Sequence, residues 1–282
     1  MGAFPSKLVE YLGSGLCIPW CGAGISVPAG LPTWSKLVSE MVAAIRDSLP
    51  TEQQSELQAL FQRGAYEDIV DFCRDSLGEG EYRDFLTRTL DIGQPSKLHR
   101  AIVHLSVPAI LTSNYDRLIE SAHATLKGYL ARVLTCQDTT SLWKHLAKRE
   151  LFILKVHGDI TRPDTVVFTS RDYTKHVFGN LAFMTFLQRL ILGHSILFIG
   201  SSLSDVYMRR ILEETTYITG GVGMPHFALL PNPGSIQSRI LRDRYNIRVI
   251  SYNPGPEGDH EPAVLEVLSG LKDATSNAGT SA

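Results

Sequence analysis

The chain has 282 residues, a formal net charge of -2 at pH 7, 44% hydrophobic residues and 20% charged residues. This length can bury a substantial core, and the composition is that of a globular protein rather than a disordered one. The near-neutral charge gives no reason to expect direct nucleic-acid binding. Apolar runs fall short of the roughly 20 residues that span a bilayer, and the start lacks a secretory pattern. We therefore expect a cytoplasmic protein without a membrane segment.

The four cysteines, Cys17, Cys21, Cys73 and Cys136, are widely spaced and form no C-x-x-C pair. Structural zinc sites and disulfide frameworks depend on clustered or paired cysteines, and the histidines show no short ligand spacing either. We therefore expect no metal, and reduced thiols that are buried or half-buried.

Apolar, β-branched runs predict six strands, at 15–20, 108–113, 151–156, 195–200, 226–230 and 247–252. Several are almost continuously hydrophobic, which is typical of strands covered on both faces. Segments with helical spacing lie between them, at 116–127, 181–192, 205–216 and 235–244. This alternation predicts an α/β fold, with a Rossmann-like, doubly wound parallel sheet and helices on both sides.

One interval interrupts the alternation. Between about 36 and 106 the pattern predicts only helices, at 36–47, 52–63, 66–76, 81–90 and 98–105. We interpret it as a helical insertion that either covers one side of a ligand crevice or forms an oligomer interface. The rest of 1–272 is expected to form one domain with it, and the small, polar tail at 273–282 is expected to be disordered.

The segment CGAGISVPAGLPTW at 21–34 follows the first predicted strand and holds three glycines and two prolines. Glycines there let backbone N–H groups approach a pyrophosphate, because no Cβ stands in the way. Val27 occupies the place of the third glycine of G-x-G-x-x-G. A tight strand-to-helix turn is therefore an equally good interpretation of this segment alone.

Three more polar motifs follow predicted strands: TSNYD at 112–116, HGD at 157–159 and GSS at 200–202. Each has a structural alternative: Asp116 can cap a helix, His157 can be structural, and Ser204 or Asp205 can cap the helix after GSS. All four motifs, however, lie at the carboxyl ends of predicted parallel strands, where open α/β sheets place their ligand crevice. Their combination favours a nucleotide site.

The motifs GAGISVPAGLP, TSNYD, VHG and FIGSSLSD, in this order, resemble the signature segments of the sirtuin superfamily over about 15–252. GLPTW, FTSRDY at 168–173 and SLSDVYMRRIL at 202–212 are similar to sirtuin-like, NAD-destroying proteins of bacterial anti-phage defence. Thr33-Trp34-Ser35 replaces the Asp-Phe-Arg of protein-deacylating sirtuins, and ligands for their four-cysteine zinc module are missing. The resemblance thus implies an NAD-binding domain with no zinc module, and the departures argue against peptide deacylation.

The resemblance implies NAD as the substrate, with Asn114 and His157 as catalytic residues. Backbone amides of 22–24 would cradle the pyrophosphate, and 200–202 would hold the adenosine end. Asp116 would bind the nicotinamide carboxamide in a pocket partly walled by Ile25 and Pro32. The full set of expected cofactor-binding residues is Gly22, Ala23, Gly24, Ile25, Ser26, Pro32, Ser113, Asp116, Gly200, Ser201 and Ser202.

The chemistry of NAD cleavage gives the catalytic residues their expected roles. Nicotinamide leaves as a neutral molecule, so the reaction needs a positioned nucleophile and a stabilised ribose cation rather than an acid. Asn114 can orient water or a ribose hydroxyl but cannot act as a base. A histidine, with an ordinary pKa of about 6.5, can accept a proton near neutrality, which gives this role to His157. Asp159 and Glu120 are the carboxylate alternatives.

Our hypothesis is an NAD glycohydrolase that produces nicotinamide and ADP-ribose and acts as a toxic effector of anti-phage defence by NAD depletion. Fold-level analogy suggests control by homo-oligomerisation or by a hetero-complex with an Argonaute-like protein or a helicase-type ATPase. The alternatives are an NAD-dependent protein deacylase or ADP-ribosyl transferase, and a sensor that binds NAD or ADP-ribose without turnover.

Overall fold

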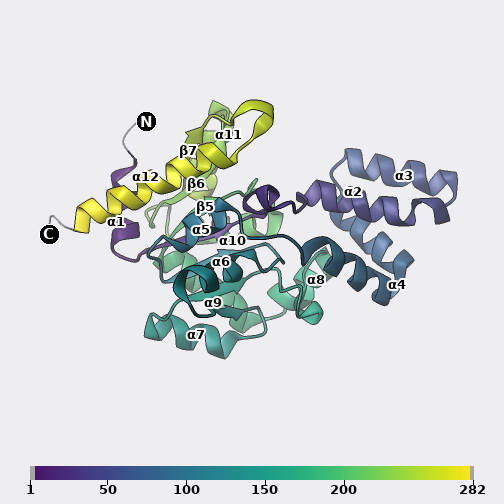
Figure 1. Cartoon of the computed structure of the whole chain (residues 1–282), viewed down its shortest axis with the longest axis horizontal. Coiled ribbons are helices and arrows are strands. Elements are labelled where there is room, and N and C mark those ends of the chain that lie inside the picture. Colours follow the sequence, from purple (N-terminus) through teal and green to yellow (C-terminus); the bar gives the residue numbers. More distant parts are fainter. Residues whose placement is uncertain (1–3, 280–282) are drawn as a thin grey trace.

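The computed structural model describes residues 4–279, which are built around a seven-stranded sheet (Figure 1). All strand pairs are parallel, and the strand order is β3-β4-β2-β1-β5-β6-β7. The strands are β1 (Cys17–Cys21), β2 (Ala109–Thr112), β3 (Arg132–Leu134), β4 (Phe152–Lys155), β5 (Ser195–Ile199), β6 (His226–Pro231) and β7 (Ile247–Tyr252). The six predicted strands and the Rossmann-like α/β fold are confirmed.

β3 is not among the six predicted strands. This strand has three residues, of which only Leu134 is buried, and it pairs only with β4 at the edge of the sheet. A short, half-exposed edge strand does not produce the apolar run by which the other strands were found.

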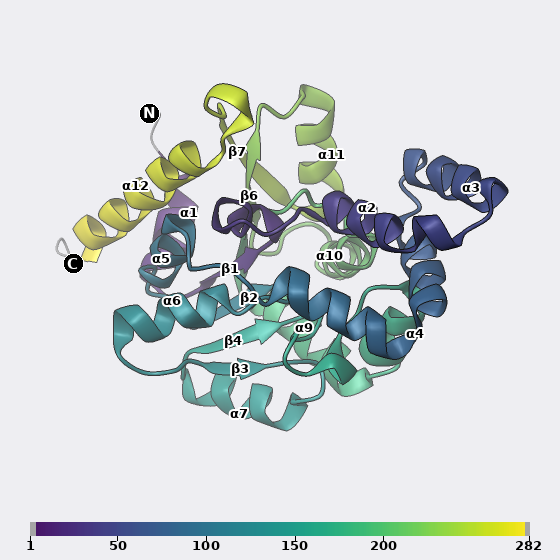
Figure 2. The same ribbon diagram turned by 45° about the vertical axis from the view of Figure 1, so that its right-hand side comes forward.

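Helices cover both faces of the sheet, as a doubly wound fold requires (Figure 2). Within β1, Ile18 and Trp20 contact one helical layer, whereas Cys17 and Cys21 contact the other, because successive side chains of a strand point to opposite faces. The first layer contains α7 (Thr139–Lys148), α9 (Leu181–Gly193), α10 (Val206–Ile218) and α11 (Ser235–Tyr245). The second contains α1 (Ser6–Gly13), α5 (Lys97–Val103), α6 (Leu118–Lys127) and α12 (Glu261–Gly279).

The last helix corrects the expected disordered tail. α12 continues to Gly279, so 273–279 are helical, while 280–282 lie outside the described residues. Its buried residues Val264, Val267, Leu268 and Leu271 have helical spacing and pack in the second layer. The residues after Lys272 are small and polar, so their composition does not show that the amphipathic helix continues into them.

The predicted helical insertion divides into two parts. α2 (Trp34–Ile45), α3 (Thr51–Gln62) and α4 (Tyr66–Leu90) share their own core and lie to one side of the sheet (Figure 1). We call these three helices the helical module. α4 merges two predicted helices, and Gly78 lies at the kink between them with φ 76°. α5 packs instead on α6 and α12, so the predicted boundary near 106 is too late.

Between residues 4 and 279, none of the helices combines the length and the apolar character needed to cross a bilayer.

Candidate active site

The four predicted motifs meet at the carboxyl edge of the sheet. Cys21 at the end of β1 pairs with Thr112 of β2 and with Ile199 of β5, and Thr112 pairs with Lys155 of β4. The strand order reverses around β1, which is the position where open α/β sheets bind ligands. Asn114 and His157 each lie two residues beyond the Thr112–Lys155 pair, so they occupy equivalent positions on neighbouring strand ends.

The glycines of the predicted phosphate cradle hold two loops together. The N–H groups of Gly22 and Gly24 donate to the carbonyls of Ile199 and Gly200, both at 2.9 Å. A Cβ on Gly24 would lie 2.8 Å from the Gly200 carbonyl oxygen, and one on Gly22 would lie 2.7 Å from it. Because these two N–H groups already have acceptors, they are not available to a pyrophosphate in this arrangement of the loops.

The other expected cofactor-binding residues are differently exposed. Ser202 is exposed, whereas Ala23, Pro32, Ser113, Gly200 and Ser201 are half-buried around the same edge. Ile25 is fully buried in the second helical layer, so it does not wall an open nicotinamide pocket as the structure stands.

Asn114 belongs to a buried hydrogen-bond network with Ser26 and Asp116. Its Nδ2 donates to the Gly22 carbonyl at 3.2 Å and to Ser26 Oγ at 3.1 Å. Ser26 Oγ in turn donates to Asp116 Oδ2 at 2.9 Å. Both Nδ2 protons are thus used, which leaves Asn114 Oδ1 as the group that can bind water or a hydroxyl.

His99 is a member of this network that the sequence analysis did not identify. Its Nδ1 accepts from the N–H of Ser96 at 3.1 Å, so the proton lies on Nε2, which is 3.3 Å from Ser26 Oγ. Burial lowers the pKa of His99 to about 4, which keeps the imidazole neutral at physiological pH. The sequence places Ser96 and His99 at the spacing of a capping box. This local pattern predicts a helix start, but it does not predict the contact between His99 and Ser26.

Asp116 is anchored from both sides. Its Oδ1 accepts from the N–H of Leu118, the first residue of α6, at 2.9 Å, although the N-cap position itself is Arg117. Its Oδ2 accepts from Ser26. Burial raises the pKa of Asp116, although hydrogen bonds from Leu118 and Ser26 oppose this rise. The carboxyl group is therefore fixed in the buried network beside Asn114.

The fully buried Lys155 holds the backbone of Tyr115 and Asp116 in place. Lys155 Nζ donates to the carbonyls of Asp116 at 2.6 Å and Tyr115 at 3.3 Å. It also pairs with Glu120 at 2.7 Å and with Asp159 at 3.2 Å. Glu120 and Asp159, the alternative bases, thus neutralise Lys155. A lysine inside the buried run LFILKV was the sequence signal for this cluster.

His157 has different partners. Its Nε2 contacts the hydroxyl of Tyr173 and lies 3.1 Å from Asp205 Oδ2. The Tyr173 hydroxyl donates to the same carboxylate oxygen at 2.9 Å. The sequence predicts only a capping role for Asp205. Asp205 also performs this role, since its Oδ1 accepts from the N–H groups of Tyr207 and Met208.

Tyr115 follows Asn114 in the chain and packs against the core of the helical module. Its ring is 6.4 Å from the His157 ring and stacks on Phe168 at 4.3 Å between centroids. Phe168 also stacks on Trp34 of α2 at 5.6 Å. The module therefore contacts, through Phe168, a residue whose ring lies close to His157.

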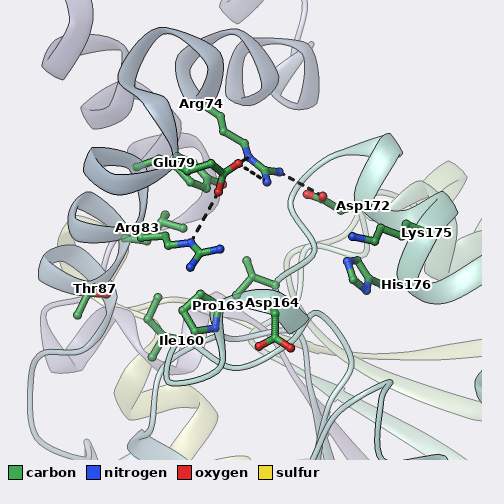
Figure 3. Close-up of a pocket in the computed structure, with 13 residues that line it drawn as sticks. Arg74, Glu79, Arg83, Thr87, Ile160, Pro163, Asp164, Asp172, Lys175 and His176 are labelled. Carbon is green, nitrogen blue, oxygen red and sulfur yellow. Dashed lines mark hydrogen bonds and ion pairs between the residues drawn. The ribbon is translucent and has the colours of Figure 1, made fainter.

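A pocket of about 180 Å³ lies between α4 and 160–176 (Figure 3). Figure 3 shows Arg83 of α4 facing Lys175 and His176, while Arg74 pairs with Glu79 at 2.6 Å and with Asp172 at 3.4 Å. Neither Asn114 nor His157 lines this pocket, so it belongs to the interface of the helical module rather than to the carboxyl edge.

Neither thiol chemistry nor a clustered metal site emerges at this edge. Within the part of the chain that the structure describes, no group of three or more His, Cys, Asp or Glu side chains is placed to hold a metal ion. All four cysteines are buried, as expected, and burial raises the pKa of Cys73 to about 12 and that of Cys136 to about 11. Thiols with such pKa values are poor nucleophiles near neutral pH.

Curated proteins similar to this chain carry names that fit such a site. "NAD(+) hydrolase ThsA" of Cytobacillus dafuensis is 28% identical over 90% of this chain and 47% of its own length. The protein of the same name from Bacillus cereus (strain MSX-D12) is 27% identical over 69% of this chain and 39% of its own. "Defense-associated sirtuin 2" of Bacillus subtilis is 22% identical over 83% of this chain and 23% of its own. The chain thus spans about half the length, or less, of the curated relatives that it matches.

The family comparison covers the carboxyl edge apart from β1 and the loop that follows it. The model of the SIR2-like domain matches residues 108–250, which begin just before β2 and end within β7. This range includes Asn114, His157 and the loop after β5, and it makes up half of the chain. The chain therefore belongs to the family of SIR2-like domains.

Proposed function

We propose that this chain is an NAD glycohydrolase that cleaves NAD to nicotinamide and ADP-ribose. The support comes from the ordered motifs at the carboxyl edge and from relatives named NAD(+) hydrolase. The observation that carries the proposal is the register of β2 and β4, because it puts Asn114 and His157 at equivalent positions on adjoining strand ends.

In this proposal the substrate lies across the ends of β1, β2, β4 and β5. Asn114 Oδ1 orients the attacking water or a ribose hydroxyl, and His157 accepts the proton as the nucleophile attacks the anomeric carbon. The exposed Ser202 and the half-buried Gly200, Ser201 and Ala23 provide the surface for the pyrophosphate and adenosine. Asp116 holds the carboxamide once the loops around Gly22 and Gly24 adjust to the ligand.

Chromatography of the purified protein with NAD tests the reaction and identifies its product. We expect nicotinamide and ADP-ribose without added peptide. His157→Ala is expected to lower turnover by roughly 10²–10⁴-fold, the range typical of general-base catalysis. Asn114→Ala is expected to lower it by about 10²-fold or more, because the nucleophile is no longer oriented. Asn253→Ala and His104→Ala, at exposed positions, are the matched controls.

Three results would contradict the proposal. Near wild-type turnover in Asn114→Ala or His157→Ala would remove these residues from the site. Nicotinamide release that depends on an acetylated peptide would indicate a deacylase. NAD binding by calorimetry without consumption would indicate a sensor.

The biological role proposed here is that of a toxic effector of anti-phage defence. The naming of a relative as defence-associated supports it. Expression of the active chain is expected to lower the cellular NAD pool and arrest growth, whereas Asn114→Ala is not. Control by a homo-oligomer or a defence partner belongs to the same proposal, and light scattering of the purified chain would detect the first.

A further inference from the structure

Two side chains from separate segments, those of Tyr173 and Asp205, meet at one nitrogen of His157. Nε2 of His157 is 3.1 Å from Asp205 Oδ2 and contacts the hydroxyl of Tyr173. The same hydroxyl is 2.9 Å from Asp205 Oδ2. The three contacts form a closed triangle. Its protons can be assigned from which groups can donate a hydrogen bond and which can only accept one.

The triangle contains two protons, one on the Tyr173 hydroxyl and one on Nε2 of His157, for the following reasons. Oδ1 of Asp205 accepts from two backbone N–H groups and Oδ2 accepts from the Tyr173 hydroxyl, which is the pattern of an ionised carboxylate. Burial raises the pKa of Asp205, but the hydrogen bonds that it accepts oppose this rise, and its pKa lies below the usual value. Burial also raises the pKa of Tyr173, which keeps its single proton in place. An ionised carboxylate can only accept, so Tyr173 donates to Asp205 and the second proton lies on Nε2 of His157. Without that proton, lone pairs of His157 and Asp205 would face each other at 3.1 Å.

We infer that Asp205 is a positioning residue that holds His157 in the Nε2–H tautomer, so that Nδ1 is the atom that accepts the proton during NAD cleavage. This inference rests on the proposed function. Nδ1 makes no hydrogen bond within residues 4–279 and is not among their buried atoms that lack a partner, which agrees with a nitrogen open to a ligand.

The carboxylate of Asp205 is itself held in a fixed orientation. Its second oxygen caps α10 by accepting from the N–H groups of Tyr207 and Met208 at 2.9 and 3.0 Å. The Tyr173 ring stacks on the Tyr207 ring at 3.8 Å between centroids, so the tyrosine that completes the triangle is anchored on the same helix. One carboxylate therefore fixes both the helix start and the histidine, which is a firm support for a general base.

Asp205→Asn is the most informative variant, because it keeps the size of the side chain and its ability to cap a helix. Its oxygen must remain on the two N–H groups of α10, which turns the NH₂ group toward His157. A donor at that position favours an unprotonated Nε2, so the variant is expected to move the proton to Nδ1 and block the base.

The tautomer can be read without any activity. In protein labelled with ¹⁵N at histidine, two-bond ¹H–¹⁵N spectra distinguish Nε2–H from Nδ1–H, and His157→Gln identifies the signal. We expect Nε2–H in the wild type, in Tyr173→Phe and in the exposed control Asp75→Asn, but Nδ1–H in Asp205→Asn. An Nδ1–H tautomer in the wild type, or no change in Asp205→Asn, would overturn the assignment.

Kinetics test the catalytic part separately. Asp205→Asn is expected to lower kcat by roughly 10²–10⁴-fold with little change in KM, since it removes a contribution of the general base. The double variant Asp205→Asn/His157→Ala should be no slower than His157→Ala, because Asp205 acts through His157. A further loss in the double variant would contradict this pathway. Unfolding midpoints of all variants are measured in parallel.

The two proposals can fail independently. A wild-type protein that releases no nicotinamide refutes the glycohydrolase and the role of Nδ1 as a base, while the tautomer spectra still decide whether Asp205 positions His157. Normal wild-type turnover with an unchanged tautomer in Asp205→Asn refutes the positioning role alone.

Discussion

At the scale of residues, the site is built from side chains whose polar atoms are almost all hydrogen-bonded within the protein. Asn114 donates its two amide protons to Gly22 and Ser26, and Ser26 in turn donates to Asp116. Such commitment fixes the direction of the remaining atoms, which is what a catalytic group needs before the substrate arrives. Neutral, buried histidines also accept hydrogen bonds that hold the fold together, and their protonation at low pH would break these bonds and lower the stability of the protein.

His226 gives a prediction about pH. Burial lowers its pKa to about 4, and its Nδ1 accepts from the N–H of Ile196 at 3.1 Å, a bond that protonation would break. The unfolded state binds a proton near pH 6.5 and the folded state does not, so this contribution to stability is complete above that pH and is lost as the pH falls toward 4. The expected slope is about 1.4 kcal/mol per pH unit for this group.

Urea unfolding between pH 7 and 4 measures this slope. His226→Gln is expected to reduce the slope of the unfolding free energy against pH by the contribution of about one proton. His99, whose pKa is also lowered by burial, continues to contribute to the slope. His104→Gln, at an exposed position, controls for the substitution itself. An unchanged slope in His226→Gln would show that this histidine is not the group being titrated.

At the scale of elements, the approach of the loops after β1 and β5 defines the carboxyl edge. The N–H of Gly24 bonds to Gly200, and φ at Gly200 is 64°, a value that favours glycine. The glycines that suggested a phosphate cradle thus have a second role, which is to let two backbones come into direct contact.

Gly24→Ala should therefore push the two loops apart. The new Cβ would lie 2.8 Å from the Gly200 oxygen and 2.9 Å from its Cα, both of them backbone atoms that cannot rotate away. We expect a destabilisation of about 1–3 kcal/mol, as for overpacking, and weaker NAD binding by calorimetry. Gly80→Ala in α4 meets no atom within 4 Å and should be neutral or stabilising by up to about 1 kcal/mol. Equal stabilities of the two variants would contradict this role of Gly24.

At the scale of the whole molecule, the helical module and the sheet share a hydrophobic cluster at the site. Phe168 and Ile160 from the sheet side lie in the core of the module, and Phe168 stacks between Tyr115 and Trp34. Tyr207, on whose ring Tyr173 stacks, donates to Glu67 of α4 at 3.0 Å. These contacts favour the covering role over a purely external interface.

Phe168→Ala tests this coupling. Phe168 is 3% exposed, so its truncation is expected to cost about 3–5 kcal/mol and to lower nicotinamide release by releasing Tyr115 beside His157. Tyr217→Ala removes an aromatic ring that is 88% exposed and should change stability by less than about 0.5 kcal/mol. Thermal unfolding and turnover measure both effects. Normal turnover in a folded Phe168→Ala protein would limit the module to a stabilising role.

The sequence by itself determined the layered fold and the edge at which the motifs gather. Buried parallel strands such as SILFIG are almost continuously apolar, and the direction of the chain then decides which end carries Asn114 and His157. It could not provide β3, whose three residues depend on β4 for their pairing. It also missed the helical continuation of 273–279 in α12.

Only the tertiary structure decided the partners of the site residues. Asp205 lies 48 positions after His157, and His99 lies 73 positions after Ser26, yet each pair is within hydrogen-bond distance. Local patterns report the period and the caps of an element, because these depend on neighbours in the chain. Which two side chains meet across elements depends on how the layers pack, and that information is distributed over the whole core.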